Sequence, residues 1–457
     1  MSVTSASART FRSLQRHRNF RLYFAGQSIS ISGTWVQNIA QAWLIVELTH
    51  SPVGSPLALG ALAAFQFLPY TVLGLLGGPL VDRFDKRMTI VATQSTLMLS
   101  AAALAILSLS GRATVWEVFV LAAVGGAVQV VDMPARQSFV FEMVGRKELP
   151  NAVSLNASLF NLARAAGPAV AGVLIATVGV TLCFAINAVS FLAVIGSLLL
   201  MRTTELFTTE RDEERQGVLS SLGEGVSWVL HTPAAWLTCG LMLVVSTFAI
   251  NFNVLLPVMA TVTLRSGPVV FGILTACFGV GALVGALVTA AVGRPSWTLL
   301  LGGAAAFSVL LMALAPLHWV AACGAMLFVT GVAFTTYTSM SNATVQLAAP
   351  DRLRGRAMAF YGYIFTGVPA PLGGLLAGWL SSVGGTQLAF LVGGGVSLAA
   401  VGVAVGVRRG AVRLPRSWRA SRASAAAANG RATSTSGRAT PAPAPAMAAS
   451  SITSDAK

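Results

Sequence analysis

Long apolar runs separated by short polar turns follow one another from Arg21 to Arg408. A helix needs about 20 mostly apolar residues to cross the ~30 Å hydrocarbon core of a bilayer. By that measure the chain holds twelve predicted membrane spans. They are residues 22–46, 57–80, 88–110, 115–136, 154–177, 180–201, 234–262, 269–292, 298–315, 319–341, 356–380 and 386–407. The pattern predicts an all-α integral membrane protein.

A hydrophilic connection, residues 202–233, divides the spans six and six. It carries most of its charges between Glu205 and Arg215, and its later part, 218–230, is amphipathic and predicted to lie on the membrane surface. Weak matches keep their order in both halves: Leu59-Gly60 resembles Phe271-Gly272, and Pro168 matches Pro371. Parallel six-span halves are typical of proteins with a substrate site between the halves at mid-membrane.

These boundaries predict five parts of the chain. They are an N-terminal segment 1–21, a bundle 22–201, the linker 202–233, a pseudo-symmetric bundle 234–407 and a basic tail 408–457 rich in Ala, Ser and Pro. Its composition predicts that the tail is disordered, with arginines that favour anionic lipid headgroups.

Composition excludes a soluble protein, because 55% of the 457 residues are hydrophobic and 10% are charged. Soluble domains average about 25% charged residues. The formal net charge of +15 would suggest nucleic acid in a soluble chain. Here almost all Lys and Arg lie in loops on one side of the predicted membrane, with the N- and C-terminal segments. Cytoplasmic loops retain positive charge, so we expect both termini in the cytoplasm and no nucleic-acid partner.

Cofactor and enzyme signatures are missing from the sequence. The four cysteines lie singly in apolar runs, and the four histidines lie apart at span ends or in loops, so we expect no metal and no cofactor. No HExxH and no GxxxxGK[ST] occurs, which argues against an intramembrane enzyme and against ATP coupling by the chain itself.

The loop after the second span carries a family resemblance. Its residues run Gly-Gly-Pro-Leu-Val-Asp-Arg-Phe-Asp-Lys-Arg from Gly77 to Arg87. This resembles the cytoplasmic signature of the major facilitator superfamily (MFS), with Asp85 in place of the second glycine. The resemblance implies the MFS fold and a cytoplasmic gate formed by Gly78, Asp82, Arg83, Lys86 and Arg87. A plain basic anchor of the membrane surface is the alternative interpretation.

A second resemblance lies in the fifth span, around Gly167, Pro168 and Gly172. It is similar to the Gly-Pro signature of exporting antiporters, in which small residues allow close helix packing and proline bends the helix. Gly33-Thr34-Trp35 and Pro134-Ala135-Arg136-Gln137 resemble the branch of enterobactin exporters and macrolide-efflux-like proteins. Two departures matter. The fourth-span arginine of many proton antiporters is absent, and Leu121 stands there, which argues against proton coupling through that arginine. The cytoplasmic aspartate has no copy in the second half, where Arg294 stands.

Amides form a polar stripe on the first span, at helical spacing. Unpaired amides are expensive in hydrocarbon, so the stripe faces either neighbouring helices or a water-filled cavity. We expect a substrate cavity, with polar counterparts in the second half and an aromatic wall on the eleventh span. Its expected residues are Gln37, Asn38, Gln41, Asn251, Asn253 and Tyr361.

Charged residues inside the spans are the remaining candidates. Asp132 and Arg136 are four residues apart and share a helix face, and Arg164 lies within the fifth span. We hypothesise that Asp132 pairs with Arg164 or Arg136 and exchanges that partner for a proton or substrate. A static gate pair of Asp132 and Arg136 at the cytoplasmic edge is the competing interpretation.

Together these features predict a secondary active transporter of the bacterial cytoplasmic membrane, acting as a monomer on a small-molecule substrate. We expect proton-coupled efflux of a small amphipathic molecule, such as a drug, macrolide or siderophore-like compound. An importer of a similar molecule is the first alternative. A channel or lipid scramblase is disfavoured by the two-fold repeat and by the lack of a repeated filter-like loop.

Overall fold

The computed structural model describes residues 11–51, 53–81, 83–207, 218–292 and 294–412. All regular structure in these ranges is helical. Up to the linker the helices are α2 (Arg12–Arg16), α3 (Arg18–Thr49), α4 (Gly54–Leu73), η1 (Gly74–Leu76), α5 (Gly77–Val81), α6 (Lys86–Leu109), α7 (Val115–Leu199) and η2 (Thr203–Glu205). The compact unit Met1–Ala404 contains every described helix, except that α15 continues beyond it.

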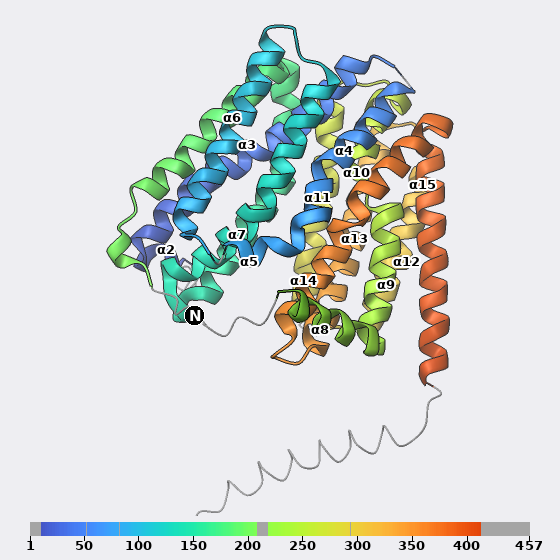
Figure 1. Ribbon diagram of the computed structural model, residues 1–457. Helices are drawn as coiled ribbons and strands as arrows, with labels where there is room; N and C mark the ends of the chain where they lie inside the picture. The colour runs from blue at the N-terminus through green and yellow to red at the C-terminus, as the bar shows by residue number, and fades with distance from the viewer. Residues whose placement is uncertain (1–10, 52, 82, 208–217, 293, 413–457) are drawn as a thin grey trace, which may run out of the picture. The chain divides into compact units, whose positions relative to one another are not determined.

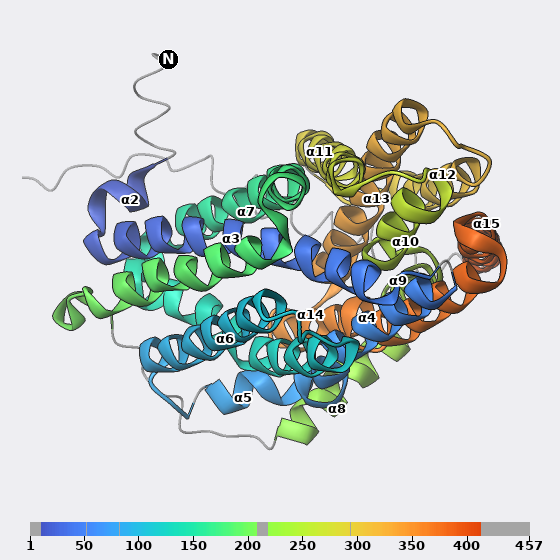
Figure 2. The same ribbon diagram turned by 90° about the horizontal axis from the view of Figure 1, so that it is seen from above.

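The helices after the linker begin with the amphipathic segment. They are α8 (Val218–His231), α9 (Pro233–Ala249), α10 (Phe252–Val258), η3 (Met259–Thr263), α11 (Pro268–Val292), α12 (Trp297–Leu314), α13 (Val320–Ala348), α14 (Arg354–Gly362), η4 (Tyr363–Gly367) and α15 (Pro369–Val412). Figures 1 and 2 show α3, α6 and α7 packed together, and α9, α12 and α13 packed together, as expected of two bundles.

Glycines divide the two longest helices into the predicted spans. Within α7, Gly145 and Gly179 have φ of 66° and 78°, a left-handed conformation that glycine adopts without steric cost. These two turns separate three predicted spans, and Gly384 and Gly385 separate the last two within α15. Most residues of each of the twelve predicted spans therefore lie on helix.

Three predicted spans are interrupted rather than continuous. The run 57–80 is helical in α4 and breaks at η1 before the short helix α5, and the run 356–380 contains the π-helical turn η4. The run 234–262 breaks at Ile250 and Asn251, shortly before Pro257. Pro257 lacks the N–H that would bind the carbonyl of Asn253, so the short helix after the break has one hydrogen bond fewer.

Eight helical segments of the described residues are long and apolar enough to cross a membrane, by length and composition. The segments built from α7 and from α14 to α15 each contain more than one predicted span. Helix α3 falls short of this threshold because its amides lower the mean hydropathy. The helix that would carry the predicted cavity stripe is thus the least apolar of the long helices in its half.

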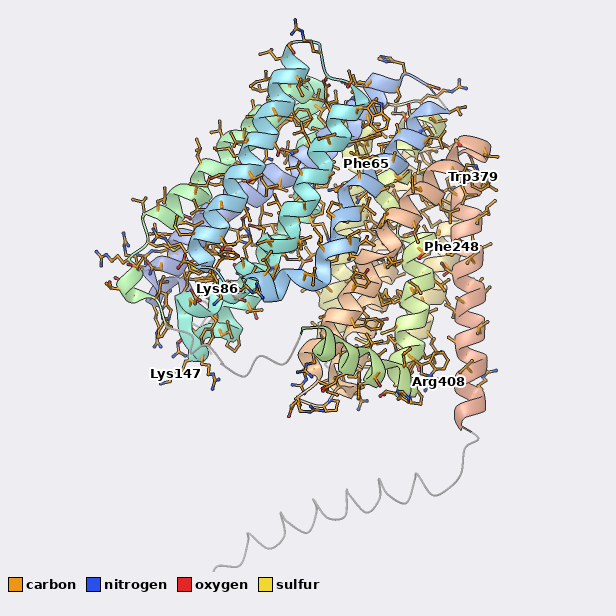
Figure 3. The ribbon with its side chains drawn as sticks, in the orientation of Figure 1. Phe65, Lys86, Lys147, Phe248, Trp379 and Arg408 are labelled. Atoms are coloured by element: carbon orange, nitrogen blue, oxygen red, sulfur yellow. The ribbon has the colours of Figure 1, made fainter. Side chains whose placement is uncertain are left out.

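In Figure 1, α2, α5, α8 and α14 lie toward one end of the unit, which we call the basic end because the loops beside these helices are rich in Lys and Arg. In Figure 3, Lys86 and Lys147 lie toward this end, and Phe65 and Trp379 lie toward the other. A core of buried side chains, including Phe20, Phe139, Met143 and Leu198, packs the first bundle near the basic end. Helix α2 is bound to α7 of this bundle, because Arg12 and Arg16 both form ion pairs with Glu148.

Candidate functional site

A buried hydrogen-bond network surrounds Asp132 in the first bundle. Its carboxylate oxygen Oδ1 accepts from the hydroxyl of Thr93 at 2.5 Å and from the amide of Gln94 at 3.0 Å, both on α6. Oδ2 accepts from Nε of Arg136 at 2.6 Å, one turn further along α7. Both oxygens of a carboxylate that is 5% exposed are therefore satisfied.

Helix α3 completes this network from the other side. The guanidinium of Arg136 donates from Nη1 to the hydroxyl of Tyr23 at 3.3 Å, and the Tyr23 ring packs edge-on against Phe139. The hydroxyl of Ser30 donates to Oε1 of Gln94 at 3.5 Å. Residues of α3, α6 and α7 thus meet on one ion pair inside the first bundle.

The chemistry open to Asp132 follows from these donors. Removing one partner of a buried ion pair typically destabilises a protein by about 3–5 kcal/mol, because the remaining charge stays buried. Here three donors, two on α6 and one on α7, surround the carboxylate. A movement of α6 against α7 would separate the carboxylate from Thr93 and Gln94.

Arg164 lies apart from this network. It is half-buried on the middle segment of α7, and no hydrogen bond or ion pair joins it to another described residue. The structure therefore places Asp132 with Arg136 and leaves Arg164 outside the pair. A charge at the centre of a bilayer costs on the order of 3 kcal/mol, so Arg164 requires water or an anion beside it.

Lys86 and Arg87 of the loop signature bind the ends of helices in the first bundle. Lys86 Nζ forms an ion pair with Glu142 of α7 at 2.6 Å. Arg87 donates from Nε to the carbonyl of Leu198 at 2.8 Å and from Nη2 to that of Leu199 at 3.3 Å. These are carbonyls of the last helical turn, where a positive charge is favourable.

Asp85, which stands in place of the signature's second glycine, has a local function. Its Oδ1 accepts from the backbone amide of Met88 at 2.7 Å and so caps the start of α6. Gly78 lies in α5, and Arg83 is exposed in the turn that follows. Asp82 lies outside the described residues, so its part in the predicted gate stays a prediction.

The glutamines of the first span bind helices of their own bundle. Oε1 of Gln37 accepts from the amide of Asn187 at 2.6 Å, and Gln41 donates to the carbonyl of Val118 at 3.4 Å. Asn38, between them on α3, is exposed. The stripe therefore includes two residues that bind neighbouring helices and one that is open to its surroundings.

The second-half candidates also differ in exposure. Asn251 is buried and donates to the carbonyl of Thr247 at 2.8 Å, whereas Asn253 is exposed. Tyr361 is buried within its own bundle, and its hydroxyl donates to the carbonyl of Thr338 at 3.4 Å. Both asparagines lie beside the break between α9 and α10, and broken membrane helices are where transporter folds place substrate groups.

Two seams of glycine join the halves. A Cβ added to Gly272 on α11 would lie 2.6 Å from the carbonyl oxygen of Pro168 and 2.9 Å from Cα of Gly172, both on α7. A Cβ added to Gly60 on α4 would lie 2.7 Å from the carbonyl oxygen of Gly374 on α15. Gly60 and Gly272 are the residues matched in the sequence repeat, so equivalent helices form equivalent seams. Gly167, next to Pro168, instead packs against Trp35.

A reciprocal pair of hydrogen bonds links α4 with η4. The hydroxyl of Thr71 donates to the carbonyl of Gly367 at 2.6 Å, and the hydroxyl of Tyr363 donates to the carbonyl of Thr71 at 2.7 Å. This contact between the halves lies closer to the basic end than the glycine seams do. It sits where α4 stops and η1 begins, beside a π-helical turn of the facing span.

Sequence reasoning did not single out several of these residues. Thr93 and Gln94 form an adjacent polar pair inside an apolar run, and that pair was a signal for a buried partner. Glu142 and Tyr23 gave no such signal, because both lie near span ends where polar side chains are common. Thr71 and Tyr363 are joined only through the tertiary fold.

Solved structures of low sequence identity share this architecture. A peptide transporter, POT, superposes with a TM-score of 0.68 at 14% identity and covers 86% of this chain and 94% of its own. A bacterial homologue of the human lysosomal transporter Spinster gives 0.64 at 12% identity, covering 87% and 94%. The helices, their glycine turns and these likenesses define the major facilitator fold.

The chain belongs to the transmembrane secretion effector family of that superfamily, whose family model matches residues 9–431. The multidrug efflux pump Tap of Mycolicibacterium fortuitum is 27% identical over 79% of this chain and 88% of its own length. The macrolide efflux protein A of Streptococcus pyogenes is 22% identical over 83% and 95%, and the staphyloferrin A transporter of Staphylococcus aureus is 25% identical over 59% and 66%.

These findings confirm the family and the fold predicted from sequence. The chain is a multi-pass bacterial membrane protein and a transporter of small molecules rather than an enzyme.

Proposed function

We propose that the chain is a secondary active exporter in which the halves 22–201 and 234–407, joined by the linker 202–233, rock against each other. The observation that carries this proposal is the pair of symmetry-related glycine seams, Gly172 with Gly272 and Gly60 with Gly374. Backbones in direct contact, without interlocking side chains, allow one helix to pivot on another. Two such seams in equivalent positions support alternating access, in which one central site opens first to one side of the membrane and then to the other.

Export of a small amphipathic molecule is the direction and cargo that we propose. The Gly-Pro signature supports it, and so do the printed functions of two relatives, a multidrug efflux pump and a macrolide efflux protein. The exposed amides Asn38 and Asn253 support a central cavity, because an amide inside an apolar span needs water or a ligand.

The proton is the coupling ion in this proposal, and Asp132 carries it. Asp132 accepts hydrogen bonds from donors on two helices, so a movement of α6 against α7 separates it from Thr93 and Gln94, and in the proposed cycle it exchanges these partners for the proton. Protonation in turn weakens the hold on Arg136. Helix movement and protonation of Asp132 therefore each favour the other, which is the requirement for coupling.

Orientation and assembly complete the proposal. The basic end faces the cytoplasm, with both termini, because positive loops are retained on that side. The protein acts as a monomer, since each chain contains both halves of the site.

Everted membrane vesicles test the function directly. Vesicles that contain the protein are energised to acidify their lumen and are given two fluorescent amphipathic probes, the cation ethidium and the anion 1-pyrenebutyrate. We expect accumulation of at least one probe, above that of vesicles without the protein, and its abolition by a proton uncoupler. Uncoupler-insensitive equilibration of probes would identify a channel or scramblase, and accumulation in right-side-out vesicles alone would identify an importer.

The coupling role of Asp132 is tested in the same vesicles. Asp132→Asn is expected to abolish proton-driven accumulation while leaving exchange of labelled for unlabelled probe. Undiminished proton-driven accumulation in Asp132→Asn would contradict the coupling role of Asp132. Asp132 and Arg136 would then be a static gate pair.

A further inference from the structure

Arg164 is the one charged residue inside the predicted spans that no opposite charge among the described residues neutralises. Apart from Glu117 and Arg356 near span ends, the charged residues of the predicted spans are Asp132, Arg136 and Arg164. Asp132 and Arg136 neutralise each other at 2.6 Å. Arg164 has no acidic partner and no hydrogen bond among the described residues. A guanidinium stays charged in any protein environment, so the described part of the spans holds one positive charge with no counter-ion among the described residues.

Its position on α7 is at the seam between the halves. The carbonyl oxygen of Arg164 would lie 3.0 Å from a Cβ on Gly279 of α11, and one turn further along, Pro168 touches Gly272. One turn in the other direction, Phe160 is 46% exposed. Arg164 therefore lies where the contact between α7 and α11, which run side by side in Figure 2, gives way to open surface.

Aromatic side chains flank Arg164 along the same helix face. Trp35 of α3 packs edge-on against Phe160 at 6.0 Å between ring centroids. Trp35 also contacts Gly167 on the other side of Arg164, where an added Cβ would lie 2.7 Å from Cβ of Trp35. Asn38, which is exposed, follows Trp35 by one turn of α3. A cation, an amide and two aromatic rings thus lie on neighbouring parts of two helices.

We propose that Arg164 binds the anionic group of the transported molecule, a carboxylate or phosphate, while Trp35 and Phe160 pack against its apolar body. This assignment deepens the proposed function and rests on it. The planar guanidinium forms two parallel hydrogen bonds with such groups. The bound anion supplies the missing counter-ion, so the site favours anionic over cationic amphipathic molecules.

Binding to purified protein in phosphatidylcholine nanodiscs tests the assignment. Three probes share one aromatic body: anionic 1-pyrenebutyrate, neutral 1-pyrenebutanol and cationic 1-pyrenebutylamine. Energy transfer from tryptophan reports their affinity. We expect the wild-type protein to bind the anion about tenfold more tightly than the other two, the gain typical of a charge-assisted pair.

Substitutions separate charge from packing. Arg164→Gln is expected to lower the affinity for the anion to that for the alcohol and to leave alcohol binding unchanged, which also shows that the variant is folded. Arg164→Lys should retain part of the preference. Arg112→Gln, in an exposed loop, is the matched control and should behave as wild type.

Three outcomes would overturn the assignment. Equal affinity of the wild-type protein for all three probes is the first, and unchanged anion binding by Arg164→Gln is the second. The third is competition by phosphatidylglycerol in the nanodisc that depends on Arg164, which would make a lipid headgroup the counter-ion. Because binding needs no gradient, a protein that binds the anion at Arg164 but fails to transport in vesicles would contradict the proposed function and leave Arg164 as an anion-binding residue only.

Discussion

The hydroxyl groups of Tyr363 and Thr71 each bind a backbone carbonyl of the opposite half. The Tyr363 hydroxyl donates to the Thr71 carbonyl at 2.7 Å, and the Thr71 hydroxyl donates to Gly367, in the π-helical turn that begins with Tyr363. Both carbonyls lie where a helix changes its winding, so their oxygen atoms can accept a hydrogen bond from a side chain. The pair is therefore placed to favour the arrangement of α4 against η4 seen here.

Tyr363→Phe is expected to weaken that arrangement. Loss of one hydrogen bond is worth about 1 kcal/mol, or roughly a fivefold shift between two conformations. Spin labels at Phe84 and Gln346, both exposed near the basic end, report the distance between the halves in a variant whose native cysteines are replaced. Tyr361→Phe is the control, because that hydroxyl binds within its own bundle. Identical distance distributions for the two variants would contradict the role of Tyr363.

Removing one residue of the Asp132–Arg136 pair should destabilise the first bundle more than removing both. Asp132→Asn or Arg136→Gln alone leaves a buried charge and is expected to lower stability by about 3–5 kcal/mol. The double variant Asp132→Asn with Arg136→Gln leaves none and should recover part of the loss. Thermal unfolding in one detergent, followed for all four proteins, measures this. A double variant less stable than both single variants would contradict the prediction that removing both charges recovers part of the stability.

The glycine seams should not accept a side chain. In Gly272→Val the new Cβ meets backbone atoms of Pro168 and Gly172, which cannot rotate away as a side chain could. We expect transport in everted vesicles to fall about tenfold or more, a barrier increase of roughly 1.4 kcal/mol or above. Gly302→Val on α12 is the matched control, since an added Cβ there meets nothing within 4 Å. Equal transport by the two variants would exclude the seam from the transport cycle.

Lys86 and Glu142 should behave as an interacting pair. The side chains are 16% and 18% exposed, so the interaction is shielded from salt more than a surface pair is. Lys86→Glu alone places two carboxylates together and should lower the melting temperature. Adding Glu142→Lys restores the opposite charges and should recover most of that loss. A double variant no more stable than Lys86→Glu would show that the two residues act independently.

The amino-acid sequence determined the class of fold, because membrane helices are specified by continuous local properties. A run of apolar residues of sufficient length is itself the signal, and Gly145 and Gly179 mark turns that few other residues would adopt without cost. The same reasoning led to the loop signature, the Gly-Pro segment and the symmetry match of Gly60 with Gly272. Each of those signals is a short stretch of neighbouring residues, and the symmetry match compares two such stretches.

Tertiary structure decided which polar residues meet. Asp132 had two basic candidates in the sequence, and packing of α3, α6 and α7 placed it with Arg136, Thr93 and Gln94. Gln37 and Gln41 belong to one stripe with Asn38, yet they bind neighbouring helices while Asn38 is exposed. Helical periodicity determines which side chains share a face. What that face contacts depends on the rotation and tilt of each helix against its neighbours, and these are set by packing over the whole bundle.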